Sequence, residues 1–126
     1  MATTVLLRNA PEHALGAFTP KPTTVTPGQS EGSVDLWTAP GETGGPVETG
    51  IWEADPGTFT ATREGYHEMC YLISGRVTLT EEGEQPLELT AGDLFVTPAG
   101  WRGTWQVHES VRKVFVIIPT APAAGA

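Results

Sequence analysis

A single carboxylate at the start of an apolar run is the feature of this sequence that most suggests chemistry. Glu68 precedes residues 69–73 (MCYLI), a run with strong β preference. A carboxyl group that faces an apolar interior is desolvated, which favours its neutral form and moves its pKa toward neutral pH. Such a group can serve as a general acid or base. We therefore predict Glu68 as the catalytic centre, and a structural ion pair or hydrogen bond, for example with Lys113, is the alternative.

Other residues, with cationic or phenolic side chains that could assist Glu68, lie near the ends of apolar strands. Arg112 and Lys113 are adjacent in the last strand, so one faces inward and the other outward, and strand parity does not choose between them. An inward cation near Glu68 would be a structural partner or a clamp for an anionic substrate. We predict Tyr66 and Lys113 as catalytic partners of Glu68, and Arg102 as a residue that orients the substrate.

Cysteine and histidine contribute less to this prediction. Cys70 shares the inward parity of Glu68, and a buried thiol in apolar surroundings is usually inert packing. His67 is next to Glu68, so strand alternation turns it to the opposite, solvent-facing side. His13 and His108 have no ligand spacing to another histidine, and we expect both at the surface.

Composition limits the classes of function. A chain of 126 residues forms one domain, and its formal charge of −8 argues against nucleic acid and anionic membrane as partners. There is no apolar run long enough to span a membrane and no secretion signal. Cys70 is the only cysteine, so an internal disulfide is excluded and a reducing, cytoplasmic location is expected.

The elements that position these residues are predicted to be short strands separated by glycine-containing turns. Such spacing predicts an all-β sandwich or barrel. We expect turns at residues 74–75 (SG) and 108–110 (HES), among others. The predicted strands are Val34–Trp37, Ile51–Ala54, Thr58–Arg63, Glu68–Ile73, Arg76–Glu81, Leu87–Leu89, Leu94–Val96, Thr104–Val107 and Arg112–Ile118.

The amino-terminal quarter is read as an arm. Residues 5–7 (VLL) are a possible short strand and residues 11–15 a possible helical turn. Residues 18–30 carry three prolines, which confine this segment to an extended arm or a sheet edge. An extended arm gains most by adding to a partner's sheet, so we predict a homodimer. The expected division is residues 1–33 as arm and edge strand, 34–119 as barrel and 120–126 as a frayed tail.

Several motifs together resemble the two conserved motifs of the cupin superfamily. The match is closest to small single-domain cupins related to ureidoglycine aminohydrolase and to the ethanolamine-utilisation cupin. It implies an antiparallel double-stranded β-helix, or jelly-roll barrel. The residues that carry it are Gly50-Ile51-Trp52-Glu53 with Pro56-Gly57, Glu68-x-Cys70-Tyr71-x-Ile73-x-Gly75, Gly92-Asp93 with Pro98-x-Gly100-Trp101-x-Gly103-x-Trp105, and residues 111–114 (VRKV).

The metal ligands of the resembled family are largely missing. Of the first motif, Glu68 and the final glycine remain, but the two histidine positions fall on Thr62 and Glu64, or on Ala61 and Arg63 with a longer spacer. In the second motif, Gly103 stands where the family has a histidine. Threonine and glycine provide no strong ligand for a first-row metal. We therefore predict no metal and no cofactor.

The missing histidine also suggests a pocket. Gly103 leaves room where that side chain would be, so we predict that Trp52 and Trp105 wall a small substrate-binding pocket around Glu68.

Three hypotheses of function follow from these residues and the resemblance. The first is a metal-independent lyase, isomerase or hydrolase that acts on a small polar metabolite and uses Glu68 as acid or base. The second is a non-catalytic small-molecule sensor or accessory protein. The third retains a metal on Glu68 with unusual partners such as Glu64, Glu53 or Tyr66.

Overall fold

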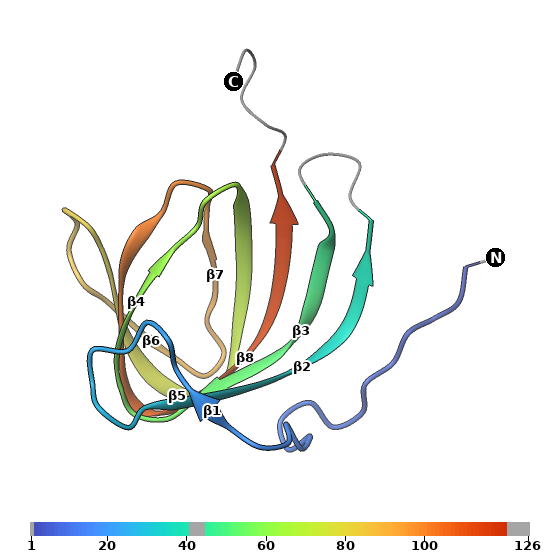
Figure 1. The fold of residues 1–126 in the computed structure, drawn as a ribbon, viewed down its shortest axis with the longest axis horizontal. Helices are drawn as coiled ribbons and strands as arrows, with labels where there is room; N and C mark the ends of the chain where they lie inside the picture. The colour runs from blue at the N-terminus through green and yellow to red at the C-terminus, as the bar shows by residue number, and fades with distance from the viewer. Residues whose placement is uncertain (1, 41–44, 121–126) are drawn as a thin grey trace, which may run out of the picture.

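The computed structural model describes residues 2–40 and 45–120, and the described residues contain strands and no helix (Figure 1). The predicted all-β, jelly-roll fold class is confirmed. The strands are β1 (Thr19–Pro20), β2 (Ser30–Ala39), β3 (Val47–Ala54), β4 (Gly57–Thr62), β5 (Tyr66–Glu81), β6 (Leu87–Thr90), β7 (Leu94–Thr97) and β8 (Arg102–Pro119).

Two long strands, β5 and β8, connect the two layers of the barrel. They pair antiparallel along most of their length. The first half of β8 also pairs with β4, and its second half pairs with β3. In the same way β5 pairs first with β7 and then with β6. The sheet therefore curves around one interior, with the order β1-β2-β3-β8-β5-β6 and with β4 and β7 as side branches (Figure 1).

The predicted turns at residues 74–75 and 108–110 are wrong, because both lie inside long strands. The pairing of β5 with β8 shifts register around Ser74 and Arg76, which marks β-bulges. Gly75 has a φ of +93°, and a Cβ there would press on the backbone of Ser110 and Val111. The glycine thus permits a bend and a close strand crossing rather than a chain reversal.

The interior is filled mainly by the inward-facing residues of β5 and β8. Glu68, Cys70 and Leu72 are buried, whereas Met69 and Tyr71 between them are exposed. This alternation is the period-2 pattern of a sheet with one buried face. The main cluster consists of Phe59, Cys70, Leu72, Val77, Leu79, Trp101, Trp105, Val107 and Val111.

The proline-rich arm pairs with its own barrel, so the premise of the predicted homodimer is wrong. β1 is antiparallel to β2, and Thr24 forms a bridge with Phe59 on β4. The Val25 amide donates to Thr58 O at 2.8 Å, and the Thr60 amide donates to Thr23 O at 3.1 Å. The arm is a sheet edge, as its prolines predict, but the edge that it extends is in the same chain.

The remaining amino-terminal predictions differ from the structure. Residues 5–7 are not a strand, and a turn at residues 10–12 replaces the predicted helical turn. Residues 121–126 of the predicted tail, and 41–44 of the loop before β3, lie outside the described residues. Over residues 2–40 and 45–120, no helix is present that could cross a membrane.

Candidate functional site

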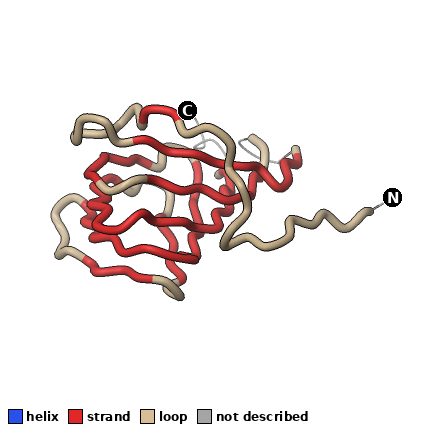
Figure 2. The backbone as a smooth tube through the Cα atoms, turned by 90° about the horizontal axis from the view of Figure 1, so that it is seen from below, coloured by secondary structure: helices blue, strands red, loops and turns tan. Residues whose placement is uncertain are grey.

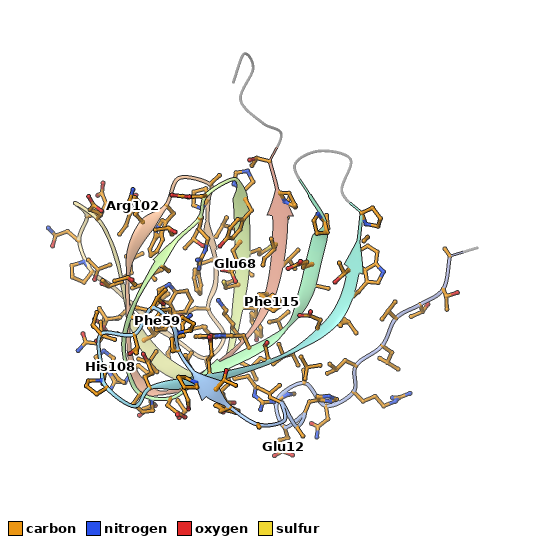
Figure 3. All side chains as sticks on the ribbon, viewed as in Figure 1. Glu12, Phe59, Glu68, Arg102, His108 and Phe115 are labelled. Atoms are coloured by element: carbon orange, nitrogen blue, oxygen red, sulfur yellow. The ribbon has the colours of Figure 1, made fainter. Side chains whose placement is uncertain are left out.

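Three buried charged side chains meet inside the barrel. The Arg63 guanidinium lies 2.7 Å from Glu68 Oε1, and Lys113 Nζ lies 3.0 Å from Glu68 Oε2. Each of the three side chains is at most 8% exposed. Figure 3 shows Glu68 on the inner side of β5. We call Arg63, Glu68 and Lys113 the charged triad.

Strand register positions two members of the triad. Glu68 on β5 is opposite Thr97 of β7 and Ile117 of β8. Lys113 on β8 is opposite Leu72 of β5 and Trp52 of β3. Directly opposed residues project to the same face, so the sheet itself brings the ammonium and the carboxylate into the interior.

Backbone hydrogen bonds position the third member. Arg63 follows β4, and its amide donates to Trp101 O at 2.9 Å while its carbonyl accepts from the Gly100 amide at 2.7 Å. Its Nε donates to Thr97 Oγ1 at 3.0 Å. The main chain of Arg63 and its Nε are therefore both fixed by hydrogen bonds, which orients the guanidinium toward Glu68. Such fixed geometry favours a strong ion pair.

Aromatic rings surround the lysine. Lys113 Nζ lies 4.6 Å from the ring centre of Trp52 and 4.5 Å from that of Trp105. Phe59 stacks on Trp105 at 5.7 Å. A cation over an indole face is attracted by the ring's negative potential, which strengthens as water is removed. The rings thus compensate part of the desolvation cost of Lys113.

Glu68 is ionised, which corrects the prediction of a carboxyl poised near neutral pH. Burial raises the pKa of Glu68, but the positive charges of Lys113 and Arg63 and the hydrogen bond from Lys113 together lower it below its usual range. The apolar run after Glu68 indicates that its carboxyl group is desolvated, but it does not reveal that two cations contact this group at the same time. At neutral pH Glu68 is a carboxylate that can accept a proton, and it has none to donate.

A cavity of about 360 Å³ opens beside the triad. Glu68 is the one acidic side chain among the described residues that line it, against the three cations Lys21, Arg63 and Lys113. Lys21 comes from the arm and lies 3.3 Å from Glu31 and 4.7 Å from the ring centre of Phe59. The lining also includes Thr23, Ser33, Trp52, Phe59, Thr60, Ala61, Thr62, Tyr66, Phe115 and Ile117.

The structure brings together four of the six predicted site residues. Glu68, Lys113, Tyr66 and Trp52 line this cavity. Trp105 is fully buried behind Lys113 and does not line the cavity. Its indole N–H has no hydrogen-bond partner among the described residues.

Arg102 and Arg112 lie away from the cavity. The Arg102 side chain is 66% exposed on the outside of the barrel, near Glu82 and far from Glu68 (Figure 3). Lys113, and not Arg112, faces inward. Arg112 bonds Glu53 at 2.7 Å and the carbonyls of Ala10 and His13, so it fastens the amino-terminal segment.

The residues present do not fit a cupin metal. Both oxygens of Glu68 are engaged by cations, and the residues described contain no group of three or more His, Cys, Asp or Glu side chains placed to hold an ion. Glu53, one of the atypical ligands considered, is paired with Arg112. A metal ion at this carboxylate would have to displace Arg63 and Lys113 and would gain few new ligands.

The prediction that Gly103 leaves room is wrong. A Cβ at this position would overlap Thr80 O, and the Trp101 ring fills the space with its nearest atom 2.6 Å from that point. The cavity is instead formed on the side of β3 and β4. A histidine at position 103 would therefore need the backbone of β5 and the ring of Trp101 to move.

Two charged residues of the cavity, Arg63 and Lys21, were not predicted from the sequence. One of the two alignments with the resembled family places a missing metal ligand at Arg63. This position was the signal by which Arg63 could have been predicted. Lys21 had no signal, because the pairing of the arm with β4 that brings it to the cavity depends on tertiary contacts.

Cys70 and His67 have structural roles. Cys70 is fully buried, which confirms its predicted inward position, and burial raises the pKa of its thiol to about 11. His67 is half-buried rather than free in solvent, and its Nδ1 accepts from the Ala99 amide at 2.9 Å.

Comparison with solved structures supports the architecture. The EutQ protein of Clostridium difficile matches 76% of this chain and 73% of its own at 22% identity, with a TM-score of 0.61. A putative ethanolamine utilization protein of Salmonella typhimurium matches with 25% identity, 72% and 71% coverage and a TM-score of 0.59. A DUF861 protein of unknown function from Pseudomonas syringae gives 26% identity and a TM-score of 0.67, over 82% of this chain and 45% of that one.

The family model of the EutQ-like cupin domain matches residues 41–115. No curated protein matches the chain. The matched residues include both motifs, Arg63, Glu68 and Lys113. With its cupin barrel and this match over more than half of its length, the chain belongs to the EutQ-like cupin domain family.

Proposed function

We propose that this protein binds a small organic anion in the barrel cavity, without a metal ion. The observation that carries the proposal is the charge of the cavity. Three of the seven basic residues of the chain line it, in a protein with a formal charge of −8. Low-dielectric walls focus the field of such charges on a ligand that enters.

The triad offers a specific place for a carboxylate. Arg63 has further N–H groups beyond the one that contacts Glu68, and Lys113 has three ammonium hydrogens. A ligand carboxylate that accepts hydrogen bonds from both Arg63 and Lys113 would form, together with Glu68, an alternating arrangement of two cations and two anions. The neutral part of the ligand would rest on Trp52 and Phe59, which line the same cavity.

The size of the cavity limits the ligand. A volume of about 360 Å³ is at the lower end of the range for small-molecule sites. This supports a metabolite of a few carbon atoms rather than a nucleotide or a peptide. The excess of cations disfavours amines, including ethanolamine, for whose utilization the Salmonella relative is named.

A thermal-shift panel tests the proposal. Small mono- and dicarboxylates, neutral alcohols and amides, and amines including ethanolamine are compared at equal concentration and low salt. We expect stabilisation by carboxylates, since a ligand that binds only the folded state raises its stability. Stabilisation by amines alone would contradict the proposal.

A second candidate is a metal-independent enzyme that transfers protons. It is supported by the ionised state of Glu68, which can accept a proton, at 3.0 Å from Lys113, which can donate one. In an isomerisation, Glu68 would take a proton from a carbon beside the ligand's carboxylate and return it to a neighbouring carbon. In a hydrolysis, it would take the proton of an attacking water.

Isotope exchange separates this enzyme from a sensor or accessory protein. A carboxylate that the panel identifies is incubated with the protein in D₂O, and its C–H signals are followed by NMR. An isomerase of this kind exchanges one carbon-bound hydrogen of the ligand for deuterium, so that one C–H signal is lost. Glu68→Gln should abolish this exchange. Binding with neither exchange nor hydrolysis of the ligand would favour the non-catalytic role.

A further inference from the structure

The cavity beside the charged triad has a second basic end at Lys21. This residue lines the cavity together with the two cations of the triad, and its Nζ lies 4.7 Å from the ring centre of Phe59. Its ion-pair partner is Glu31, at 3.3 Å, which is not one of the lining residues. Lys21 therefore presents a positive charge to the cavity that Glu68 does not neutralise.

The local backbone fixes the position of Lys21. It lies between Pro20 and Pro22, and a proline restricts the residue before it to extended conformations. The Lys21 amide donates to Gln29 O at 3.0 Å, and its carbonyl accepts from the Thr24 amide at 3.2 Å. The loop between β1 and β2 lies against the barrel in both views (Figures 1 and 2). A cation that is fixed before a ligand arrives reduces the ordering entropy that binding costs.

The ion pair with Glu31 leaves part of the Lys21 ammonium group available. Glu31 Oε1 accepts from Trp52 Nε1 at 2.8 Å and lies 3.3 Å from Lys21 Nζ. An ammonium group has three hydrogens, so one ion pair leaves two of them for other acceptors. The Lys21 side chain is only 16% exposed, and salt screens a partly buried charge less than a charge in open solvent.

Two aromatic rings lie between the basic ends of the cavity. Lys113 Nζ is 4.6 Å from the ring centre of Trp52, and Lys21 Nζ is 4.7 Å from that of Phe59. The two rings meet edge to face with their centres 5.7 Å apart. Each ammonium group thus lies against one of two neighbouring rings. This arrangement fits a ligand with an anionic group at each end and a carbon chain between them.

The formal charges of the cavity also match a dianion. Among the described residues that line it, three are cations and one, Glu68, is a carboxylate, which leaves two positive charges. A single ligand carboxylate at the triad neutralises one of these charges. A second carboxylate at Lys21 neutralises the other.

We propose that the ligand is a linear dicarboxylate, with one carboxylate at Arg63 and Lys113 and the other at Lys21. The proposal rests on the binding of an organic anion proposed above, and it makes Lys21 the residue that distinguishes a dicarboxylate from a monocarboxylate. The carbon chain of the ligand contacts Trp52 and Phe59. Because Lys21 belongs to the arm, the arm contributes directly to the choice of ligand.

Calorimetric titration of dicarboxylates and their monoamides tests the proposal. Succinate, glutarate and adipate are each compared with the monoamide, which has nearly the same shape and one negative charge less. For the chain length that fits, we expect the wild type to bind the dicarboxylate at least about tenfold more tightly than its monoamide, because a partly buried cation receives the second charge. Lys21→Met should abolish this preference while it still binds the monoamide.

Two further variants isolate the charge of Lys21 from its structural role. Glu31→Gln breaks the same ion pair but keeps the ammonium group, so it should retain a preference for the dicarboxylate. Arg102→Met removes an exposed cation outside the cavity and should behave as the wild type does. Hydrogen exchange of the Val25 and Thr60 amides verifies that the arm remains paired with β4 in each variant.

The outcomes separate this proposal from the proposed function. If the wild type binds each dicarboxylate and its monoamide equally, or if Lys21→Met keeps the preference, the assignment of Lys21 is overturned and the anion site at the triad stands. A preference lost equally in Glu31→Gln and Lys21→Met would also overturn it, since the ion pair rather than the charge would then be responsible. Failure of every carboxylate to bind would overturn both proposals.

Discussion

Two buried cations, Arg63 and Lys113, contact Glu68 inside the barrel. In the metal-binding cupins that the sequence resembles, a carboxylate at this position is one ligand among several. Here Arg63 and Lys113 bind its two oxygens at 2.7 and 3.0 Å. Arg63 falls on a missing ligand position in one of the two alignments with that family, and its guanidinium places a positive charge beside Glu68.

Protonation of Glu68 should destabilise the fold in acid. Its folded pKa is below the unfolded value, so its contribution to stability is complete above the unfolded pKa of about 4.3 and is lost as the pH falls through the folded pKa. Replacement by Gln removes the charge at every pH. We expect Glu68→Gln to lower the free energy of unfolding at pH 7 by about 3 kcal/mol, because two buried cations lose their counter-charge.

Urea unfolding from neutral pH down to the acid limit measures this effect. The difference between wild type and Glu68→Gln should shrink below pH ~4 as the wild type also loses the charge. Glu109→Gln, an exposed carboxylate on β8, is the control and should change stability by less than about 0.5 kcal/mol. A difference that stays constant down to the acid limit would contradict ionisation of Glu68.

At the scale of residues, the sequence predicted which side chains face the cavity better than it predicted their electrostatics. Period-2 alternation places Glu68 inside and groups Lys113 with Phe115 and Ile117, which also line the cavity. Arg63 lies beyond the end of β4, so no parity rule applies to it. The pKa of Glu68 depends on both cations and could not follow from the apolar run alone.

At the scale of elements, the bends in β5 and β8 form the barrel. Each strand belongs to both layers, and Gly75 lies at a close approach of the two strands. Glycine is typical of a turn and equally of a bulge. The sequence therefore predicted two short strands where one long strand exists, and only the pairing with β8 decides between these possibilities.

Gly75→Ala should be more destabilising than Gly92→Ala. The two glycines have similar φ angles, +93° and +97°, so both variants incur a similar cost for an alanine with a left-handed backbone. A Cβ at Gly75 meets the backbone of Ser110 and Val111, whereas at Gly92 it meets nothing within 4 Å. Chemical denaturation should give a difference of at least about 2 kcal/mol between the variants. Equal losses would show that close approach is not the reason for Gly75.

The Thr24 hydroxyl connects residues of the arm to one another and to β4. Its hydroxyl lies within 3.2 Å of Gln29 Oε1 and of the carbonyls of Thr26 and Thr58, and it accepts from the Thr26 amide at 3.0 Å. Thr24→Val should cost about 1–2 kcal/mol in unfolding experiments. It should also weaken ligand binding, because the arm carries Lys21 to the cavity.

Hydrogen exchange tests whether Thr24→Val releases the arm. Hydrogen exchange of the Val25 and Thr60 amides reports release of the arm and should accelerate in Thr24→Val. Val25→Ala, at a 65% exposed position, is the control and should leave both amides protected. Unchanged protection in Thr24→Val would mean that backbone pairing alone holds the arm.

At the scale of the whole molecule, charge is unevenly distributed. Positive charge is concentrated in the cavity of an acidic protein. Net charge and strand spacing can be read from the sequence, but neither gives this distribution. It arises because strand register turns Lys113 inward, and because the arm folds back to the cavity.

Isothermal titration of a carboxylate ligand into three proteins tests the central claim most directly. The proteins are wild type, Lys113→Met and Arg102→Met, titrated at low salt after circular dichroism has confirmed that each is folded. Loss of a buried cation that receives the carboxylate should weaken binding at least tenfold in Lys113→Met. Arg102→Met removes an exposed cation outside the cavity and should bind as wild type does. Equal affinity of Lys113→Met and wild type would contradict an anion site at the charged triad.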